Sequence, residues 1–337
     1  MGNNCCHGET LDKTGEVQSS FHYQTTKKNR VNKQTINKEE DLVHLPKNQE
    51  DSRVDEMNQI NPKVEEALEL HPHFEVDQEY LNESFDNYPI DGPYLYKDKS
   101  TYKGHFKNGK RHGFGKQIWK DGSYYEGTWI NDKIEGMGRL IHANGDIYIG
   151  ELKNNQADGK GKLIQLDRTI FQGEWKNNQQ EGYGKEKWDD GSKYEGEYSK
   201  GLKHGKGKFM WADGSYYEGE FFNNLMQGKG TYIWSDQRMY TGDWKNNKMH
   251  GTGTFNWPDG RVYNGDYFED LKHGYGEFTW ADGRIFKGEW FEGKQDGKGE
   301  FVFITGESRL GVWNNGVLEK WEDGETNLIT RLNNVIK

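Results

Sequence analysis

The sequence predicts an all-β fold: an elongated single-layer antiparallel β-meander of about 20 strands, with a disordered N-terminal tether and a short C-terminal capping helix. The first observation is composition, because the 337 residues include 44 Gly, 12 Trp, 19 Tyr and 16 Phe but only 6 Pro. So little proline excludes collagen, and so many aromatics argue against a wholly disordered chain. No apolar run approaches the roughly 18 residues that span a bilayer. The other two observations are that every Trp lies within residues 119–321 and that this region repeats.

The repeat sets the strand positions. An aromatic residue followed two positions later by Gly recurs nine times, always 23 residues after the last (125 − 102 = 23). A Gly-x-Gly pair follows each lead aromatic, from Gly113 and Gly115 in the first unit to Gly297 and Gly299 in the ninth. The tenth slot is degenerate and holds Arg309. The nine lead aromatics are Tyr102, Tyr125, Tyr148, Phe171, Tyr194, Tyr217, Tyr240, Tyr263 and Phe286.

Each unit is predicted to be a β-hairpin. The lead aromatic, the Gly and a large residue four positions after the lead alternate at period 2, which is typical of a strand. A turn such as Asn177-Asn178 follows, because Asn tolerates the positive φ of a tight hairpin turn. The second strand starts at the Gly-x-Gly pair and ends at a turn such as Asp213-Gly214, which leads into the next unit.

The alternation places the aromatics and most glycines of both strands on one face. A Gly between two aromatics leaves room for neighbouring rings to lie across it. An exposed row of rings would suit an extended peptide, a helix or an edge strand of a partner. The competing interpretation, which we favour residue by residue, is that the rings are the core of the array. The candidate partner-binding residues are Trp129, Trp175, Trp244 and Trp290.

The unit resembles the MORN repeat (membrane occupation and recognition nexus). The resemblance rests on Tyr194-Glu-Gly-Glu-Tyr198, on His204-Gly-Lys-Gly207 and on the 23-residue period, and it covers about residues 92–313. It implies a twisted hairpin solenoid without catalysis of its own. Members of the family act as scaffolds at membranes, cell cortices, cilia and flagella, and some self-associate. The open edges of the expected sheet would also allow a homodimer, end to end or side by side. A role in phospholipid binding is proposed for the family.

The expected domains follow from the extent of the repeats. Residues 1–60 form an acylated, disordered tether, and residues 61–91 form an acidic linker with a short helix. Residues 92–313 form the array, and residues 314–337 form a cap that we expect to be helical.

The N-terminus has the features of an acylation signal. Gly2 becomes the acceptor for N-myristoylation once Met1 is removed, and Cys5 and Cys6 lie where palmitoylated cysteines are common. Cys6 occupies the position at which the usual myristoylation pattern has Ser or Thr. Two acyl chains would hold the protein firmly at a membrane. A redox pair, half a metal site or an unmodified terminus are the alternatives, but no third Cys exists to complete a zinc site.

Charge follows the same division of the chain. A basic cluster at Lys27, Lys28, Arg30 and Lys33 would add about 1 kcal/mol per residue near an anionic leaflet, although a solvated stretch is the alternative. The net charge is +3 over residues 1–38 (6 − 3), −12 over 39–100 (5 − 17) and −1 over 101–337 (34 − 35). The array has no basic stripe, so nucleic acid is not an expected partner. We expect the protein at the cytoplasmic face of a plasma, ciliary or cortical membrane, or otherwise in the cytoplasm or cytoskeleton.

Two short helices are predicted outside the array. Asn61-Pro62 is a favourable helix start, and the helix would end before Pro72. At the other end of the chain, apolar residues at helical spacing predict a cap over the open sheet edge or the aromatic groove, with a partner-binding helix as the alternative. The apolar residues of this second helix are Leu328, Ile329, Leu332, Val335 and Ile336.

Two rows of polar residues imitate catalytic or metal-binding sites. His112, His204, His250 and His273 share one slot, which other units fill with Glu, Asp or Gln. Neighbouring units lie about 9.5 Å apart, too far for most of these side chains to share an ion, so we interpret them as turn residues. The acidic row from Glu151 to Glu289 lies on a flat sheet, where cross-strand Lys partners explain it better than hydrolysis does. We therefore expect no enzyme activity, no cofactor and no metal.

Three function hypotheses follow. The first is a membrane-anchored scaffold that binds the cytoplasmic leaflet through acyl chains and recruits cytoskeletal, ciliary or signalling proteins through its array. The second is a structural spacer of an axoneme or cell cortex without a lipid anchor. The third, a regulatory or targeting subunit of a phosphoinositide kinase, comes from proteins in which MORN arrays are fused to lipid kinases.

Overall fold

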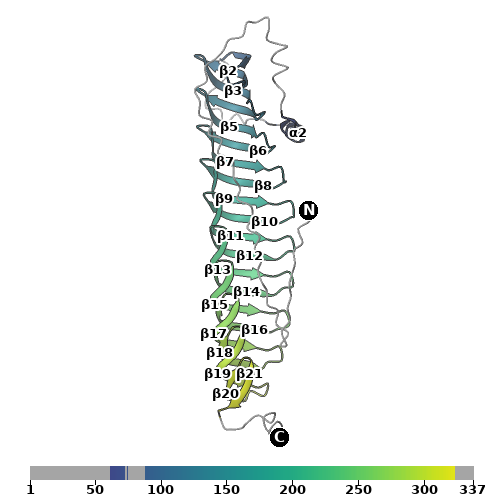
Figure 1. The fold of residues 1–337 in the computed structure, drawn as a ribbon, viewed down its shortest axis with the longest axis vertical. Helices are drawn as coiled ribbons and strands as arrows, with labels where there is room; N and C mark the ends of the chain where they lie inside the picture. Colours follow the sequence, from purple (N-terminus) through teal and green to yellow (C-terminus); the bar gives the residue numbers. More distant parts are fainter. Residues whose placement is uncertain (1–60, 73, 75–87, 323–337) are drawn as a thin grey trace. The chain divides into compact units, whose positions relative to one another are not determined.

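The computed structural model describes residues 61–72, 74 and 88–322. They form one helix and 21 β-strands, in which every strand is antiparallel to the strand it pairs with (Figure 1). The predicted all-β meander is thereby confirmed. The chain divides into two compact units between Leu202 and Lys203, and each unit is described in turn.

The N-terminal unit contains helix α2 and the first ten strands. Each strand pairs with the strand that follows it in the chain. Its elements are α2 (Pro62–Leu70), β1 (Ile90–Leu95), β2 (Thr101–Lys107), β3 (Lys110–Ile118), β4 (Tyr124–Ile130), β5 (Lys133–Ile141), β6 (Ile147–Lys153), β7 (Gln156–Ile164), β8 (Ile170–Lys176), β9 (Gln179–Lys187) and β10 (Lys193–Ser199).

The C-terminal unit continues the same pattern of hairpins, and its last strand lies beyond residue 313, where the sequence analysis ended the array. The tether 1–60 and the predicted helix over Leu328–Ile336 lie outside the described residues. The strands are β11 (Leu202–Met210), β12 (Tyr216–Phe222), β13 (Leu225–Ile233), β14 (Met239–Lys245), β15 (Lys248–Asn256), β16 (Val262–Phe268), β17 (Leu271–Thr279), β18 (Ile285–Phe291), β19 (Lys294–Val302), β20 (Ser308–Asn314) and β21 (Val317–Trp321).

The two-residue turns connect each hairpin to the one before it. Asn223 and Asn224 both have positive φ, 50° and 71°, as a type I′ turn requires. The Asn224 amide donates to the Lys203 carbonyl at 2.9 Å, and its Oδ1 accepts from the Lys203 amide at 2.8 Å. This pair of bonds spans 21 residues of sequence and joins successive hairpins at their turns. The same two bonds occur at Asp132, Asn155, Asn178, Asn247 and Asp270.

The core is a ribbon of rings packed over glycines. Tyr217 is fully buried, and a Cβ added to Gly230 would lie 2.3–2.5 Å from atoms of its ring. The Tyr217 hydroxyl donates to the Glu220 carbonyl at 3.0 Å. Trp244 meets the rings of Tyr217 and Tyr240 edge-on, with centroids 5.3 and 5.2 Å away. Only glycine fits beneath these rings, which is the device that the sequence predicted.

Helix α2 begins where the sequence predicted. Asn61 Oδ1 accepts from the Lys63 amide at 3.0 Å, and Pro62 occupies the first helical position. The buried Val64 and Ala67 pack against Tyr124, Ile141 and Ile147 on strands β4 to β6. These three residues point away from the ring core, so the helix covers an apolar part of the otherwise mostly polar face.

Candidate protein-binding surface

The four predicted partner-binding tryptophans lie in the core. Trp129, Trp175, Trp244 and Trp290 are only 2%, 4%, 2% and 6% exposed. Each indole N–H donates to the carbonyl of a core glycine; Trp244, for example, donates to Gly230 at 3.1 Å. Buried rings of this kind offer no open face to a partner, which agrees with the interpretation that they belong to the core of the array.

A second set of rings lies at the mouth of the longer turns of the C-terminal unit. Trp234 begins one such turn: its carbonyl accepts from the Gln237 amide and its own amide donates to the Arg238 carbonyl, both at 2.9 Å. Its ring lies 4.5 Å from Tyr232 and 5.1 Å from Phe255. All members of the set are partly exposed. We call this set the open ring row: Trp211, Trp234, Trp257, Trp280, Phe303 and Trp321.

Further rings, of which three are buried and Phe301 is partly exposed, make the row continuous. Tyr232, Phe255, Phe278 and Phe301 alternate with the members of the row, and successive centroids lie 4.3–5.6 Å apart from Trp211 to Phe303. Trp321 closes the row at 6.0 Å from Phe303. Aromatic contacts at these separations are stabilising, so each partly exposed ring of the row is held in place by neighbouring rings.

Arginines line the row. Arg238, Arg261 and Arg284 lie 5.5, 5.2 and 5.5 Å from the centroids of Trp234, Trp257 and Trp280. Each is fixed by an ion pair of 2.7–2.8 Å with the Asp two residues earlier. The row therefore presents ring faces with guanidinium groups beside them, a combination that suits aromatic, proline-rich or acidic peptide segments.

The corresponding slots of the N-terminal unit hold fewer rings. In the N-terminal unit the corresponding slots hold Gln117, Leu163 and Glu186 in place of the buried rings, and His142 and Gln165 in place of two tryptophans. Sequence reasoning missed the row, although the signal was present: Trp211, Trp234, Trp257 and Trp280 recur at the same 23-residue period as the lead aromatics.

The histidine slot proves to be part of the turns. In some units this slot holds Glu, Gln or Asp, which accepts from the first amide of the next two-residue turn; Glu135 accepts from the Asn154 amide at 2.9 Å. In others a histidine stacks on a phenylalanine, as His273 does at 5.2 Å from Phe291. The described residues hold no group of three or more side chains able to ligate a metal ion.

The acidic row shows the expected cross-strand lysine pairing at Asp243, which forms an ion pair of 2.6 Å with Lys229 on the neighbouring strand, and it also has a second role at the strand bulges. Strands β12 and β13 pair from Gly219 to Gly230 and resume at Glu220 and Gln227, which leaves a bulge at the Gly-x-Gly pair. The Glu220 carboxylate accepts from the amide of Lys229, inside the bulge, at 3.2 Å. Glu151, Asp243 and Asp266 cap the corresponding bulges in the same way.

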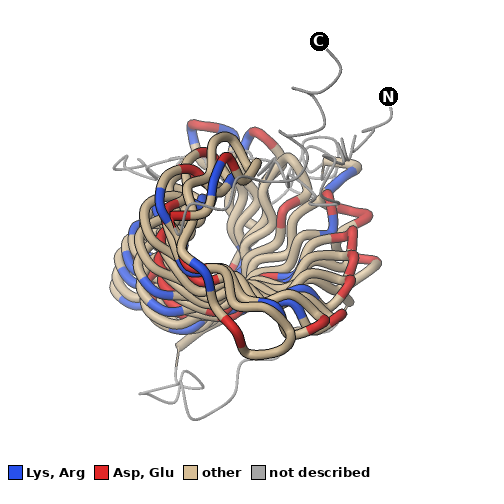
Figure 2. The backbone as a smooth tube through the Cα atoms, turned by 90° about the horizontal axis from the view of Figure 1, so that it is seen from below, with Lys and Arg blue, Asp and Glu red and all other residues tan. Residues whose placement is uncertain are grey.

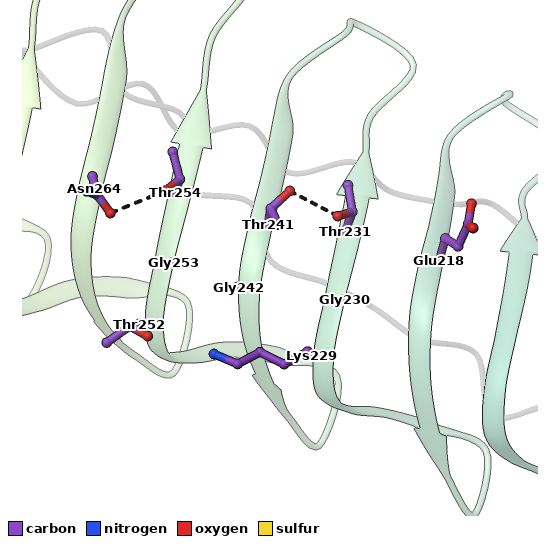
Figure 3. Close-up of a pocket in the computed structure, with 10 residues that line it drawn as sticks. All are labelled: Glu218, Lys229, Gly230, Thr231, Thr241, Gly242, Thr252, Gly253, Thr254 and Asn264. Atoms are coloured by element: carbon purple, nitrogen blue, oxygen red, sulfur yellow. Dashed lines mark hydrogen bonds between the residues drawn. The ribbon is translucent and has the colours of Figure 1, made fainter.

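The polar face of the C-terminal unit has a hollow of about 490 Å³ (Figure 3). Glycines and short hydroxyl side chains form it, where neighbouring units carry Lys–Glu pairs such as Lys208–Glu218. Thr231 and Thr241 share a hydrogen bond of 2.9 Å, and Thr254 donates to Asn264 at 3.2 Å. The hollow holds one carboxylate and no histidine, a set suited to hydrogen bonding rather than acid–base chemistry.

Charge and membrane signals complete the inventory. Acidic and basic residues both occur around the turns of the array, as Figure 2 shows. Among the described residues, no helix is long and apolar enough to cross a membrane. The predicted lipidation residues Gly2, Cys5 and Cys6 and the basic cluster of Lys27, Lys28, Arg30 and Lys33 lie outside the described part of the chain.

Hairpins of 23 residues that share one ring core define a repeat scaffold of the solenoid class. The chain belongs to the MORN-repeat family, because nine consecutive segments match the family and together cover more than half of it. The matched segments are 102–124, 125–147, 148–165, 171–193, 194–216, 217–237, 240–260, 263–283 and 286–308.

The remaining comparisons add little. The TCP10 domain of Danio rerio CPAP, in complex with a peptide of Danio rerio STIL, is similar at 11% identity and a TM-score of 0.38, over 62% of this chain and 93% of that one. The SAS-4 (dCPAP) TCP domain of Drosophila melanogaster, in complex with a proline-rich motif of Ana2 (dSTIL), is similar at 14% identity and a TM-score of 0.30, over 45% and 83%. Scores this low carry no argument about function. No curated protein matches the sequence.

Proposed function

We propose that this protein is a non-catalytic scaffold, held at the cytoplasmic face of a membrane by its acylated N-terminus, that binds an extended segment of a partner protein along the open ring row. The observation that carries the proposal is the row itself: partly exposed rings, stacked continuously and flanked by arginines. Exposed aromatic surfaces of this kind are typical of interaction sites.

The repeat distance of the row supports an extended ligand. Successive tryptophans of the row are two strands apart, about 9.5 Å at the usual strand spacing. A polyproline II helix repeats every three residues, about 9.3 Å. A segment in this conformation would therefore present the same side to each successive ring, and its preformed backbone would lose little entropy on binding.

The anchor rests on the sequence of the N-terminus. Myristate at Gly2 with palmitate at Cys5 and Cys6 would provide the two signals that stable attachment requires, and the basic cluster that follows would strengthen attachment to an anionic leaflet. The same terminus would place the array within reach of cortical or ciliary partners.

The binding role is tested by comparing partners across variants. We expect Trp257→Ser combined with Trp280→Ser to abolish the capture of specific partners by the full-length protein in quantitative pull-downs. Trp188→Ser is the matched control, because Trp188 occupies the same slot outside the row. The double variant should also bind synthetic peptides with proline at every third position more weakly than the wild type does. In the wild type, the affinity for such peptides should rise with peptide length. Equal capture by both variants would contradict the binding role.

The anchor is tested separately. Metabolic labelling with clickable myristate and palmitate should mark the wild type and spare Gly2→Ala with Cys5→Ser and Cys6→Ser. We expect this triple variant to move from the membrane fraction to the soluble one while retaining peptide binding. An unchanged distribution would favour the lipid-free structural spacer.

A further inference from the structure

A second apolar patch on the polar face, in the C-terminal unit, repeats the seat of helix α2. In the N-terminal unit Tyr124 pairs across strands with Ile141, and Arg139 pairs with Ile149; Tyr124, Ile141 and Ile149 pack in the cluster that α2 covers. Equivalent positions occur 161 residues later, which is seven periods of 23 (285 − 124, 302 − 141 and 310 − 149). There Ile285 pairs with Val302, and Glu300 pairs with Leu310.

The equivalent residues differ in burial. Tyr124 and Ile141 are 6% and 0% exposed beneath α2. Ile285 and Val302 are partly exposed, and Leu310 is 57% exposed. Both sites present apolar side chains at these three positions, although Ser308 takes the place of Ile147 and Thr279 that of Ile118 in the second site. Only the first site is covered by a described element. We call Ile285, Val302 and Leu310 the C-terminal patch.

We propose that the C-terminal segment, residues 326–337, docks on the C-terminal patch as a second short helix, in the manner of α2. The segment follows directly from β21, and its apolar residues Leu328, Leu332 and Ile336 recur at i, i+4 and i+8, on one side of a helix. A helix over 328–336 has nine residues, as α2 has. This inference does not depend on the proposed partner binding or on the lipid anchor.

The segment is long enough to reach the patch. Strand β18, which carries Ile285, is three strands from β21, about 14 Å at the usual spacing. The residues between Trp321 and Leu328 span up to about 20 Å when extended. The helix itself would be about 14 Å long, which is enough to lie across the strands that form the patch.

Charge favours this occupant. Helix α2 carries three Glu and one Lys, and Arg139 beneath it donates to the His71 carbonyl at its C-terminal end and to the Glu126 carboxylate. At the C-terminal patch Glu300 takes the place of Arg139, and the segment 326–337 contains Arg331 and Lys337 but no acidic residue. Lys287, the cross-strand partner of Glu300, takes the place of Glu126, so the charged pair of the seat is inverted. Glu300 therefore offers the C-terminal segment an acidic partner where Arg139 lies beneath the acidic helix α2.

Disulfide trapping in the full-length chain tests the proposal. In a background with Cys5→Ser and Cys6→Ser, Leu310→Cys combined with Leu332→Cys should form an intramolecular disulfide in glutathione disulfide, which gains the two hydrogens that the thiols lose. The matched control combines Leu310→Cys with Asn334→Cys, on the opposite side of the predicted helix. We expect the first pair to close at least tenfold faster than the second.

The results of this experiment distinguish docking of residues 326–337 from contact with a second copy of the chain. Adding Glu300→Arg to the variant with Leu310→Cys and Leu332→Cys should slow disulfide closure by about two- to fivefold. This is the effect expected when the attraction between Glu300 and the basic residues of the segment is lost. Leu310 is largely exposed, so its substitution leaves the fold intact. The proposal is overturned if the two pairs close at equal rates, if the charge reversal has no effect, or if the disulfide forms between two copies of the chain. Loss of membrane or partner binding has no bearing on these rates.

Discussion

Asp270 occupies a turn position at which a carboxylate costs stability. Its Oδ1 accepts from the Met249 amide at 2.8 Å, and its own amide donates to the Met249 carbonyl at 3.0 Å. Burial raises the pKa of Asp270 from 3.8 to about 6, and the Met249 amide only partly offsets this effect. Four other repeats hold Asn at this position, which accepts the same hydrogen bond without a charge: Asn155, Asn178, Asn224 and Asn247.

The substitution Asp270→Asn should therefore stabilise the protein at neutral pH. A shift of about two units corresponds to about 3 kcal/mol, and the partial solvent access of the carboxylate reduces the expected gain to about 1–2 kcal/mol. The folded state holds the proton more tightly than the unfolded state does. The contribution of Asp270 to stability is thus fully present below about pH 4 and is lost as the pH rises through 6.

Urea unfolding followed by tryptophan fluorescence, at pH 7.0 and at pH 4.5, measures both effects. We expect the gain from Asp270→Asn to be clearly larger at pH 7.0, because at pH 4.5 the wild-type carboxyl is mostly protonated in the folded state. Asn247→Asp is the matched control and should destabilise the protein with the opposite pH dependence. A loss of stability in Asp270→Asn at pH 7.0, or a gain equal at both pH values, would refute the reasoning.

Three further predictions concern packing, and thermal unfolding measures all of them. Gly253→Ala would place a methyl group within 2.5 Å of a buried tyrosine ring and should lower the free energy of unfolding by about 1–3 kcal/mol. Gly214→Asn lies in open space, at a φ that Asn tolerates, and should lower it far less. Trp244→Ala truncates a core side chain and should lower the free energy of unfolding by about 3–5 kcal/mol. Trp257 is partly exposed, so Trp257→Ala should lower it markedly less, and equal losses would contradict the assignment of these residues to core and surface. Glu126→Gln leaves a buried arginine without its carboxylate and should cost about 3–5 kcal/mol, so a neutral result would show that this pair is solvated.

Much of the fold was predictable because its rules are local. The Asn turns demanded positive φ, the period-2 alternation separated two faces, and Asn61-Pro62 marked the start of α2. The end of the sheet was misplaced, because Val317 to Trp321 lies where a cap was expected and lacks the Gly-x-Gly signature. The acidic row was interpreted through cross-strand pairing because the bulge that it caps depends on strand register.

The candidate site was harder to predict. Four lead aromatics are followed by Trp four residues later, and these tryptophans lie on the same 23-residue period as those at the longer turns, so the sequence does not distinguish a core row from an open one. The distinction is made by the surroundings in the sheet: Trp244 is buried and donates to the Gly230 carbonyl of β13, whereas Trp257 begins a turn and stays partly exposed.

The sequence by itself determined the repeat, the hairpin and the glycines beneath the rings, because the period of 23, the positive-φ turns and the absence of a Cβ are properties of single residues and short spacings. Only the tertiary structure decided which rings are open, which acids cap bulges and where α2 lies. Those features depend on the pairing of residues far apart in the chain, as when Ile141, buried under α2, and Val302, partly exposed, occupy the same slot of the repeat.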